Sequence, residues 1–413
     1  MTNIKKYLNS KFIFLSINVL VLAVFFILVP WVNHVFAAPV ILFALLLFVS
    51  LFDKKNKRPL IDWERWLLVL LVLFFVSQFI TKYFIDGYRN PASFEQSFRF
   101  FIGALAYLYY RKYPINWNVL APLVAIGCIS AGIQAIEAPA HRLVSVMPAI
   151  KYGTYSALIS VLMFYAALHA IASPGKIHKI KAVIYFICMI VAAYVNVRAE
   201  SKMPVLAMFF GYMAVLIIFI IPLIKVLGWK IISALLVVFI SLIAVSGMFI
   251  MKNNIGKRFN NAVVNFNNYE FGKKSTASTS LRLDMWSIAK LHATDSIILG
   301  NGQTGVQRLY KKYSDEKMVS PSLKRFQHMH NDYIDIYMKS GLFGLMVLLG
   351  LYFVLLKVSL QYQSMPIFLF VLINMLCGLT DITFSHMISI TVFLTFLILL
   401  LPNLSAEKSR SLN

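Results

Sequence analysis

Runs of roughly twenty apolar residues recur along this chain, and they constrain its fold more than any other feature. Each run is long enough to cross about 30 Å of hydrocarbon as an α-helix, and a helix satisfies its backbone hydrogen bonds internally, as lipid requires. Of the 413 residues, 60% are hydrophobic and only 13% are charged, about half the charged share of a soluble domain. The sequence therefore predicts an all-α polytopic membrane protein.

We predict about twelve transmembrane helices and divide the chain into three parts. Residues 1–251 hold the first nine spans, residues 252–332 form one large polar loop, and residues 333–413 hold the last three spans. The first span follows three lysines, as in a signal peptide, but its length and the many later spans favour an uncleaved helix. The predicted spans are 12–30, 35–51, 66–80, 98–110, 118–136, 154–172, 182–197, 204–224, 231–251, 333–356, 366–382 and 387–402.

The distribution of basic residues predicts the orientation. With the N-terminus in the cytoplasm, the inner segments carry eighteen Lys and Arg residues and the short outer loops carry seven. Short cytoplasmic loops are enriched in Lys and Arg, whereas loops longer than about sixty residues largely escape this rule. We therefore expect both termini in the cytoplasm and the long polar loop on the outer side.

The polar loop is itself basic. Residues 252–332 hold thirteen Lys or Arg residues against six acids, a net charge of +7. A basic outer surface favours an anionic partner such as a phospholipid, a phosphorylated glycolipid or a polyprenyl diphosphate; a solvated loop without a ligand is the alternative. Nucleic acid is disfavoured as a partner, because the basic residues are divided between two faces of a membrane.

One helix is expected inside the loop. Ser278-Thr279-Ser280 precede an amphipathic stretch up to Lys290, which predicts a capped helix with Asp284 near its positive end. Leu281, Met285 and Ile288 share one stripe, which is suited to lying on the membrane surface. Gly300-Asn301-Gly302 then predicts a turn.

Several kinds of chemistry are disfavoured by what the sequence lacks. All three cysteines fall in predicted spans, which implies no disulfide framework. We find neither a metal-ligand spacing nor a phosphate-binding Gly-Lys-Ser/Thr loop. The sequence therefore predicts no metal, no other cofactor and no ATP hydrolysis.

His330 is the candidate catalytic residue. It lies just before a span, and an imidazole, whose pKa is near neutrality, can act as a general base toward a hydroxyl group; an interfacial histidine without a catalytic role is the alternative. Asn331 follows at once, and Gly341 and Gly344 come ten and thirteen residues later. Two glycines at this spacing permit close approach of another helix, which would fix the helix that presents His330.

Outer-face arginines are the candidate phosphate-binding residues. Arg198 ends the seventh predicted span, and Arg142 and Arg282 are expected on the same side. Guanidinium groups match phosphate oxygens and can neutralise a leaving diphosphate, although an arginine at a helix end can also simply reach toward the membrane interface or pair with Glu200. Asp381, an acid in the mostly apolar eleventh span, is a further candidate.

These residues resemble a known family. His330-Asn331, followed by Gly341 and Gly344, is similar to the signature of bacterial O-antigen ligases, which share a superfamily with O-antigen polymerases and protein O-oligosaccharyltransferases. Thr279-Ser280-Leu281-Arg282 and Gly378-Leu379-Thr380-Asp381 are also similar to ligase sequences. The chain departs from the commoner pattern after Arg198, where it carries Glu200 and Lys202.

The resemblance implies a GT-C-like glycosyltransferase at the inner membrane of a Gram-negative bacterium. Such an enzyme would transfer O-antigen polysaccharide from undecaprenyl diphosphate to the outer core sugar of lipid A-core on the periplasmic face, with inversion and without metal or ATP. Beside these two substrates, its partners would be membrane lipids.

The resemblance also implies roles for the candidate residues. His330 would deprotonate or orient the acceptor hydroxyl, and Arg198 and Arg282, with Arg142 as a third contact, would hold the diphosphate. Asn331, Asp381 and His328 would support the site.

Three alternatives remain open. A polymerase would extend the glycan on its own lipid carrier, and a protein O-oligosaccharyltransferase would attach it to Ser or Thr. A transporter of anionic lipids is disfavoured because, apart from Glu137 and Asp381, the predicted spans are nearly free of acids.

Overall fold

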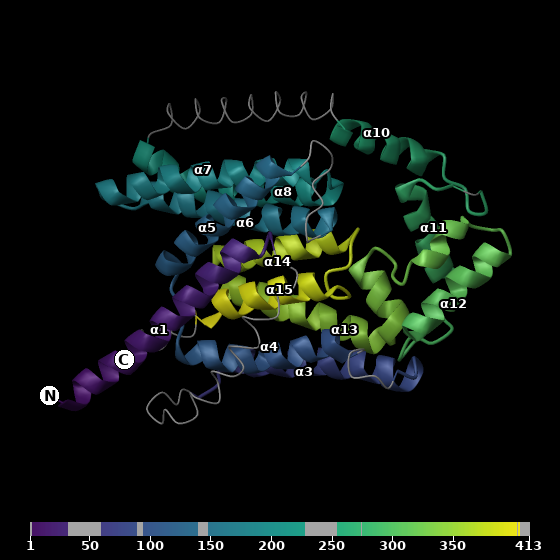
Figure 1. Ribbon diagram of the computed structural model, residues 1–413, viewed down its shortest axis with the longest axis horizontal. Coiled ribbons are helices and arrows are strands. Elements are labelled where there is room, and N and C mark those ends of the chain that lie inside the picture. Colours follow the sequence, from purple (N-terminus) through teal and green to yellow (C-terminus); the bar gives the residue numbers. More distant parts are fainter. Residues whose placement is uncertain are drawn as a thin grey trace.

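A computed structural model of the chain describes residues 2–31, 59–88, 94–138, 148–227, 254–273, 275–402 and 404. Every regular element within these residues is a helix, and most helices run side by side in one bundle (Figure 1). The helices are α1 (Thr2–Leu28), α3 (Asp62–Ile80), η3 (Thr81–Ile85), α4 (Glu95–Lys112), α5 (Trp117–Glu137), α6 (Ala149–Ala172), α7 (Lys176–Arg198), α8 (Lys202–Leu227), α10 (Asn254–Asn267), α11 (Ser278–Leu291), α12 (Gly302–Asp315), η5 (Pro321–Arg325), α13 (Asp332–Gln361), α14 (Met365–Gly378) and α15 (Met387–Leu400).

The described part contains six helices that are long and apolar enough to cross a membrane: α3 with η3, α5, α6, α7, α8 and α13. The apolar segments of α1, α14 and α15 are shorter. Helix α4 covers the predicted span 98–110 but is less apolar, because it carries Glu95 and three basic residues. The predicted spans 35–51 and 231–251 lie outside the described residues, so the total of twelve stays a prediction.

Helix α6 is the central helix of the bundle. Its most apolar window is 78% buried, against 28% for α3 with η3 and 33% for α8. It packs against α5, α7, α8 and α14, while α3 packs against α4 and α13. The outer helices α3 and α8 expose apolar side chains such as Trp66 and Ile217, which is the pattern expected of faces in contact with lipid.

Four short helices, α10, α11, α12 and η5, cover one end of the bundle, at the right in Figure 1. We call them, with the turns that join them, the loop subdomain. They share a small core of their own, in which Met285 and Ile288 of α11 pack with Val306 and Tyr310 of α12. Met338 of α13 joins this core, so the start of α13 ties the loop subdomain to the bundle.

Helix α11 forms where the sequence predicts it, but two details of that prediction are wrong. The N-cap residue is Ala277, and no side chain caps the helix. The stripe of Leu281, Met285 and Ile288 is at most 9% exposed and faces the core of the loop subdomain, not a membrane surface. Helix α12 and its neighbours cover the stripe, which amphipathic periodicity alone cannot foresee.

Gly341 does not serve as a contact for another helix. It interrupts α13 with a φ of 64°, and a Cβ atom there would lie 2.2 Å from the carbonyl oxygen of Ile298. Its neighbour is therefore the backbone of the turn between α11 and α12. Gly344 faces Ser340 and Ile336 of its own helix.

Candidate functional site

His330 lies on the short turn between η5 and α13, where the loop subdomain meets the bundle. Its own backbone has a φ of 50°, which is uncommon outside glycine. The next residue, Asn331, caps α13 by accepting hydrogen bonds from the amides of Tyr333 at 3.0 Å and Ile334 at 3.1 Å. The Asn331 Nδ2 also donates to the Leu379 carbonyl at 2.9 Å. Asn331 thus fixes His330 between the start of α13 and the connection after α14.

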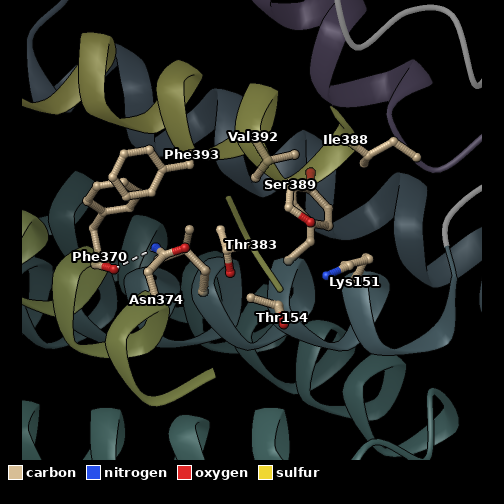
Figure 2. Close-up of a pocket in the computed structure, with 11 residues that line it drawn as sticks. Lys151, Thr154, Phe370, Asn374, Thr383, Ile388, Ser389, Val392 and Phe393 are labelled. Carbon is tan, nitrogen blue, oxygen red and sulfur yellow. Dashed lines mark hydrogen bonds between the residues drawn. The ribbon is translucent and has the colours of Figure 1, made fainter. Parts of the chain in front are cut away.

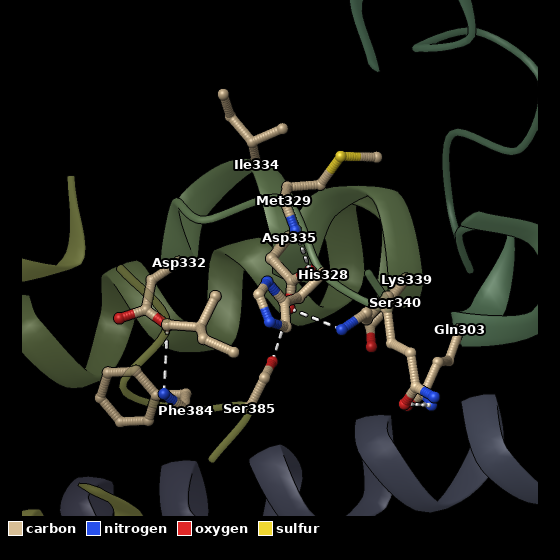
Figure 3. A network of polar contacts seen from close by, with 12 residues as sticks. Gln303, His328, Met329, Asp332, Ile334, Asp335, Lys339, Ser340, Phe384 and Ser385 are labelled. Atoms are coloured by element: carbon tan, nitrogen blue, oxygen red, sulfur yellow. Dashed lines mark hydrogen bonds and ion pairs between the residues drawn. The ribbon is translucent and has the colours of Figure 1, made fainter. Parts of the chain in front are cut away.

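Two buried carboxylates complete this attachment. Asp332 accepts hydrogen bonds from the amides of Thr383 at 2.8 Å and Phe384 at 3.1 Å. Asp335 accepts from the Met329 amide at 2.9 Å and from the Ser385 hydroxyl at 2.6 Å (Figure 3). Both carboxylates therefore bind the segment 383–385, and Asp335 also binds Met329, the residue before His330.

Asp332, Asp335 and Lys339 were missed in the sequence analysis. Lys339 Nζ lies 2.8 Å from the Asp335 carboxylate, and both side chains are buried. The signal was present, because positions 332, 335 and 339 fall on one face of a helix. The expectation of spans nearly free of acids overlooked Asp335, which lies inside the predicted span 333–356.

His328 and His330 form a pair. Their ring centroids are 4.3 Å apart with the planes at 87°, and the ring of Phe326 lies 5.4 Å from that of His330. The Nδ1 atoms of both histidines, and that of His386, are buried without a hydrogen-bond partner among the described residues. A buried nitrogen without a partner is costly, which is typical of a site arranged for a ligand.

The surroundings keep His330 uncharged. Burial lowers its pKa to about 3, and His328, Arg282 and Lys151 act in the same direction, against Asp381. Burial also lowers the pKa of His328, and it lowers that of His386 to about 4. A neutral imidazole retains a lone pair that can accept a proton or a hydrogen bond from a hydroxyl group.

Asp381 is beside this cluster, but not inside a helix as predicted. Helix α14 ends at Gly378. Beyond it, the Leu379 carbonyl accepts a hydrogen bond from Asn331, and the Thr383 amide donates one to Asp332. The Asp381 carboxylate lies 2.6 Å from Nζ of Lys151 on α6, and both side chains are buried. Burial raises the pKa of Asp381, but Lys151 outweighs it and the net shift is downward. Lys151 was not singled out from the sequence.

A cleft of about 630 Å³ opens beside Arg282, between α8, α10 and α11. Its volume falls in the range of small-molecule and cofactor sites. Three basic side chains, Arg282, Lys202 and Arg258, line it together with Thr380, the neighbour of Asp381. Apolar side chains, including Phe259, Val263, Phe266 and Leu206, form another part of its wall. Positive charge next to an apolar wall suits an anion attached to a hydrocarbon chain.

The other two predicted arginines differ from Arg282. Arg198 ends α7, where it donates hydrogen bonds to the Tyr194 hydroxyl at 3.1 Å and to the Ala138 carbonyl at 3.5 Å. Among the described residues, it is not part of the cleft lining. Arg142 lies outside the described residues. Instead Glu200, two residues after Arg198, reaches the cleft and forms a 3.0 Å ion pair with Arg258.

A second, much smaller cavity lies inside the bundle. Its volume is about 20 Å³, and Lys151, Thr154, Asn374 and Thr383 contribute polar groups to its lining (Figure 2). That volume holds about one water molecule, so the cavity is too small for a substrate. Within the described residues, no three His, Cys, Asp or Glu side chains are arranged to hold a metal ion.

A comparison with known protein families covers the same region. Residues 184–349 match a family model described as O-antigen ligase. A protein of Haemophilus influenzae, described as an uncharacterized protein, is 29% identical over 98 residues, which are 24% of this chain. The aligned stretch covers 25% of that protein, so the chain matches about a quarter of the length of its curated relative. The family match takes in Arg198, the loop subdomain, His330 and Gly341.

Proposed function

Because the chain belongs to the O-antigen ligase and polymerase superfamily, we propose that it transfers O-antigen polysaccharide from undecaprenyl diphosphate to the outer core sugar of lipid A-core. The observation that carries the proposal is the half-buried His330, whose Nδ1 atom has no hydrogen-bond partner among the described residues, near Arg282 of a basic cleft of about 630 Å³. We place the reaction on the periplasmic face of a Gram-negative inner membrane, with both termini in the cytoplasm. The bundle would then correspond to a GT-C-like scaffold.

The cleft is the proposed binding site for the donor. Arg282, Lys202 and Arg258 would neutralise the diphosphate, since charged hydrogen bonds to phosphate are the strong ones. The apolar wall of Phe259, Val263 and Phe266 would receive the first isoprene units. The amino-terminal end of α11, with Ser278 and Thr279 in the cleft lining, adds backbone amides and a positive helix end.

His330 is the proposed acceptor-activating residue. The hydroxyl oxygen of the acceptor sugar attacks the anomeric carbon, and its proton passes to the free imidazole nitrogen. The bond from that carbon to the diphosphate breaks, undecaprenyl diphosphate leaves, and the configuration inverts. Arg282 stabilises the charge that develops on the leaving group.

The low pKa of His330 fits a base that the donor activates. Burial, His328 and the positive Arg282 and Lys151 disfavour the imidazolium. A bound diphosphate brings negative charge next to the ring, and nearby negative charge favours the protonated form. The donor would therefore raise the basicity of His330 at the moment it is needed.

Most of the remaining residues around the site, some predicted from the sequence and some found only in the structure, are given positioning roles. Asn331 and Asp335 fix the backbone of the His330 turn through the contacts described above. The Lys151–Asp381 ion pair places a carboxylate near Arg282 and His330, since Asp381 raises the pKa of both groups. His328 packs edge to face against His330 and restricts its ring. Arg198 is proposed to contact the donor outside the cleft, and Arg142 stays the proposed third contact of the diphosphate.

The test is complementation of a Gram-negative strain that lacks its own ligase but has a matching core and O-antigen. Lipopolysaccharide ladders are compared for the wild type, His330→Ala, Arg282→Gln and the control His178→Ala at the start of α7, at matched expression. We expect a ladder with the wild type and the control only.

Other outcomes separate the members of the superfamily. Longer lipid-linked polymer without a ladder would indicate a polymerase, and glycosylated protein would indicate an O-oligosaccharyltransferase. A ladder that persists in His330→Ala would contradict the catalytic assignment.

A further inference from the structure

The turn between α11 and α12 carries an exposed apolar tip. Ile297, Ile298 and Leu299 are consecutive, and 48%, 70% and 43% of their surfaces are accessible. Consecutive apolar residues at this exposure are unusual on a surface in water. The loop subdomain also exposes Val263 and Phe266 on α10, where they line the cleft, but Ile297, Ile298 and Leu299 are three exposed apolar residues in a row and lie outside the cleft lining.

The backbone of the tip is held by α13. The break at Gly341 leaves the amides of Leu342 and Phe343 without their ordinary helical acceptors, and they donate to the carbonyls of Ile297 at 2.7 Å and Ile298 at 3.2 Å. On the other side, the Asn301 amide donates to the Met338 carbonyl at 2.7 Å. Two carbonyls of the tip are therefore paired with α13 while its side chains stay exposed, which reduces the cost of bringing this irregular backbone close to lipid.

The tip continues a surface that is already suited to lipid. Directly after the junction, α13 exposes Leu342, Met346, Leu349 and Phe353, with 40% to 65% of their surfaces accessible. These residues are three or four positions apart, so they form one stripe along a candidate membrane span. The tip lies where this stripe begins.

A second span end adjoins the same place. Asp86, just after η3, accepts hydrogen bonds from the amides of Gln303 at 3.1 Å and Thr304 at 2.8 Å, at the start of α12. Phe84, two residues earlier, is 70% exposed. The tip is thus close to the ends of two apolar helices, the α3–η3 span and α13.

We infer that Ile297, Ile298 and Leu299 insert into the boundary between headgroups and acyl chains of the bilayer and seat the loop subdomain on the membrane. The occupant of this surface is lipid, because the exposed apolar stripe of α13, a candidate membrane span, continues it. The contact also reaches the candidate site: the turn is bonded to α13 at Met338, and three residues earlier Asp335 holds the Met329 amide next to His330. Lipid would therefore help to position the His330 turn.

Spin labelling of the full chain in lipid nanodiscs tests this inference. A nitroxide is attached to Ile298→Cys and, as the matched control, to Glu316→Cys at the far end of α12, which is exposed. The three native cysteines are buried and are monitored in the unsubstituted chain. We expect the label at 298 to collide more with oxygen than with a nickel chelate, and the label at 316 to show the opposite order.

Two results would overturn the inference. Equal access of the nickel chelate to both positions would place the tip in water, and shielding of position 298 from both reagents would mean that protein covers it. Thermal unfolding of both labelled chains in nanodiscs verifies that they are folded. The accessibility of the label does not depend on glycosyl transfer, so the inference can fail or hold independently of the proposed function.

Discussion

The bundle buries ionic clusters at both ends, and the two differ in how completely their atoms are paired. At the end away from the loop subdomain, the Glu64 carboxylate accepts hydrogen bonds from Arg111 Nε at 2.7 Å, the Tyr107 hydroxyl at 2.9 Å and the Ile61 amide at 3.0 Å. Arg111 also donates to the Pro59 carbonyl. These contacts use both carboxylate oxygens, so the Glu64 cluster has the character of a structural element.

The cluster around His330 is incomplete by comparison. Lys151 and Asp381 form an ion pair as short as that of Glu64 and Arg111, but the Nδ1 atoms of His328, His330 and His386 have no partner among the described residues. A cleft also opens at Arg282. Burial of charge therefore does not distinguish the two ends. The unpaired histidine nitrogens and the cleft at Arg282 do.

The largest expected effect is that of His330→Asn. Asparagine tolerates the left-handed backbone at this position but cannot act as a base, so we expect glycosyl transfer to fall by ~10²- to 10⁴-fold. The midpoint of thermal unfolding should stay close to that of the wild type. Initial rates with purified protein and lipid-linked donor provide the measurement. Activity near the wild-type level would leave His330 as a structural residue.

Glu64→Gln should have the opposite effect, which is a loss of stability with catalysis retained. Loss of the carboxylate leaves Arg111 buried without its charge partner, which costs about 3–5 kcal/mol of stability. The folded fraction should retain its transfer rate and its affinity for donor. Thermal unfolding in detergent gives the stability, with Tyr107→Phe as a milder variant expected to lose about 1 kcal/mol. A selective loss of catalysis in folded Glu64→Gln would contradict the interpretation that the Glu64 cluster is structural and the His330 cluster is functional.

Arg282→Gln should weaken donor binding. Charged hydrogen bonds contribute about 1.5–3 kcal/mol, which corresponds to an increase of ~10- to 100-fold in the KM for the donor. Arg308→Gln, on the exposed part of α12, is the matched control and should leave KM unchanged. An equal change in both variants would indicate general surface charge and not the cleft.

The histidines of the site should make stability depend on pH. An unfolded histidine titrates near pH 6.5, whereas the pKa is about 3 for His330 and about 4 for His386 in the folded chain. Between these values the unfolded state binds more protons, so the free energy of unfolding rises with pH. We expect the unfolding midpoint to fall from about pH 7 to about pH 4, and less steeply in His330→Asn. Parallel curves for both proteins would argue against a His330 that stays neutral in the folded chain.

The smallest expected effect is a gain in affinity for pyrophosphate. Glu200 pairs with Arg258 at 3.0 Å in the cleft, and this carboxylate would compete with a diphosphate for the same guanidinium. A partly exposed ion pair contributes up to about 1 kcal/mol, so Glu200→Gln should tighten pyrophosphate binding by about two- to five-fold. The gain should disappear in the Glu200→Gln, Arg258→Gln double variant. Glu270→Gln, an exposed acid outside the cleft lining, serves as the control in calorimetry.

Much of the framework could be predicted from the sequence. The apolar runs located α3, α5 to α8 and α13 to within a few residues, and the Ser278 segment located α11. His330, Asn331 and Asp381 were singled out, and the structure brings them together with Arg282. Lys151 was missed because it lies 230 residues from Asp381, and no local pattern connects them. Gly341 was singled out as a position of close approach, but the sequence did not show that the backbone of Ile298 is what approaches it.

The sequence by itself determined that this chain forms apolar helices, because span length is set by the bilayer. It also predicted that chemistry lies where the loop 252–332 meets the last spans, because charged groups need water or a partner. Only the tertiary structure decided which groups meet. The buried stripe of α11, the end of α14 at Gly378 and the docking of the 297–300 turn on Gly341 all depend on contacts between distant segments. Those contacts also decide that Arg258 and Lys202 line the cleft with Arg282, because a cavity forms only where helices from different parts of the chain fail to fill the space between them.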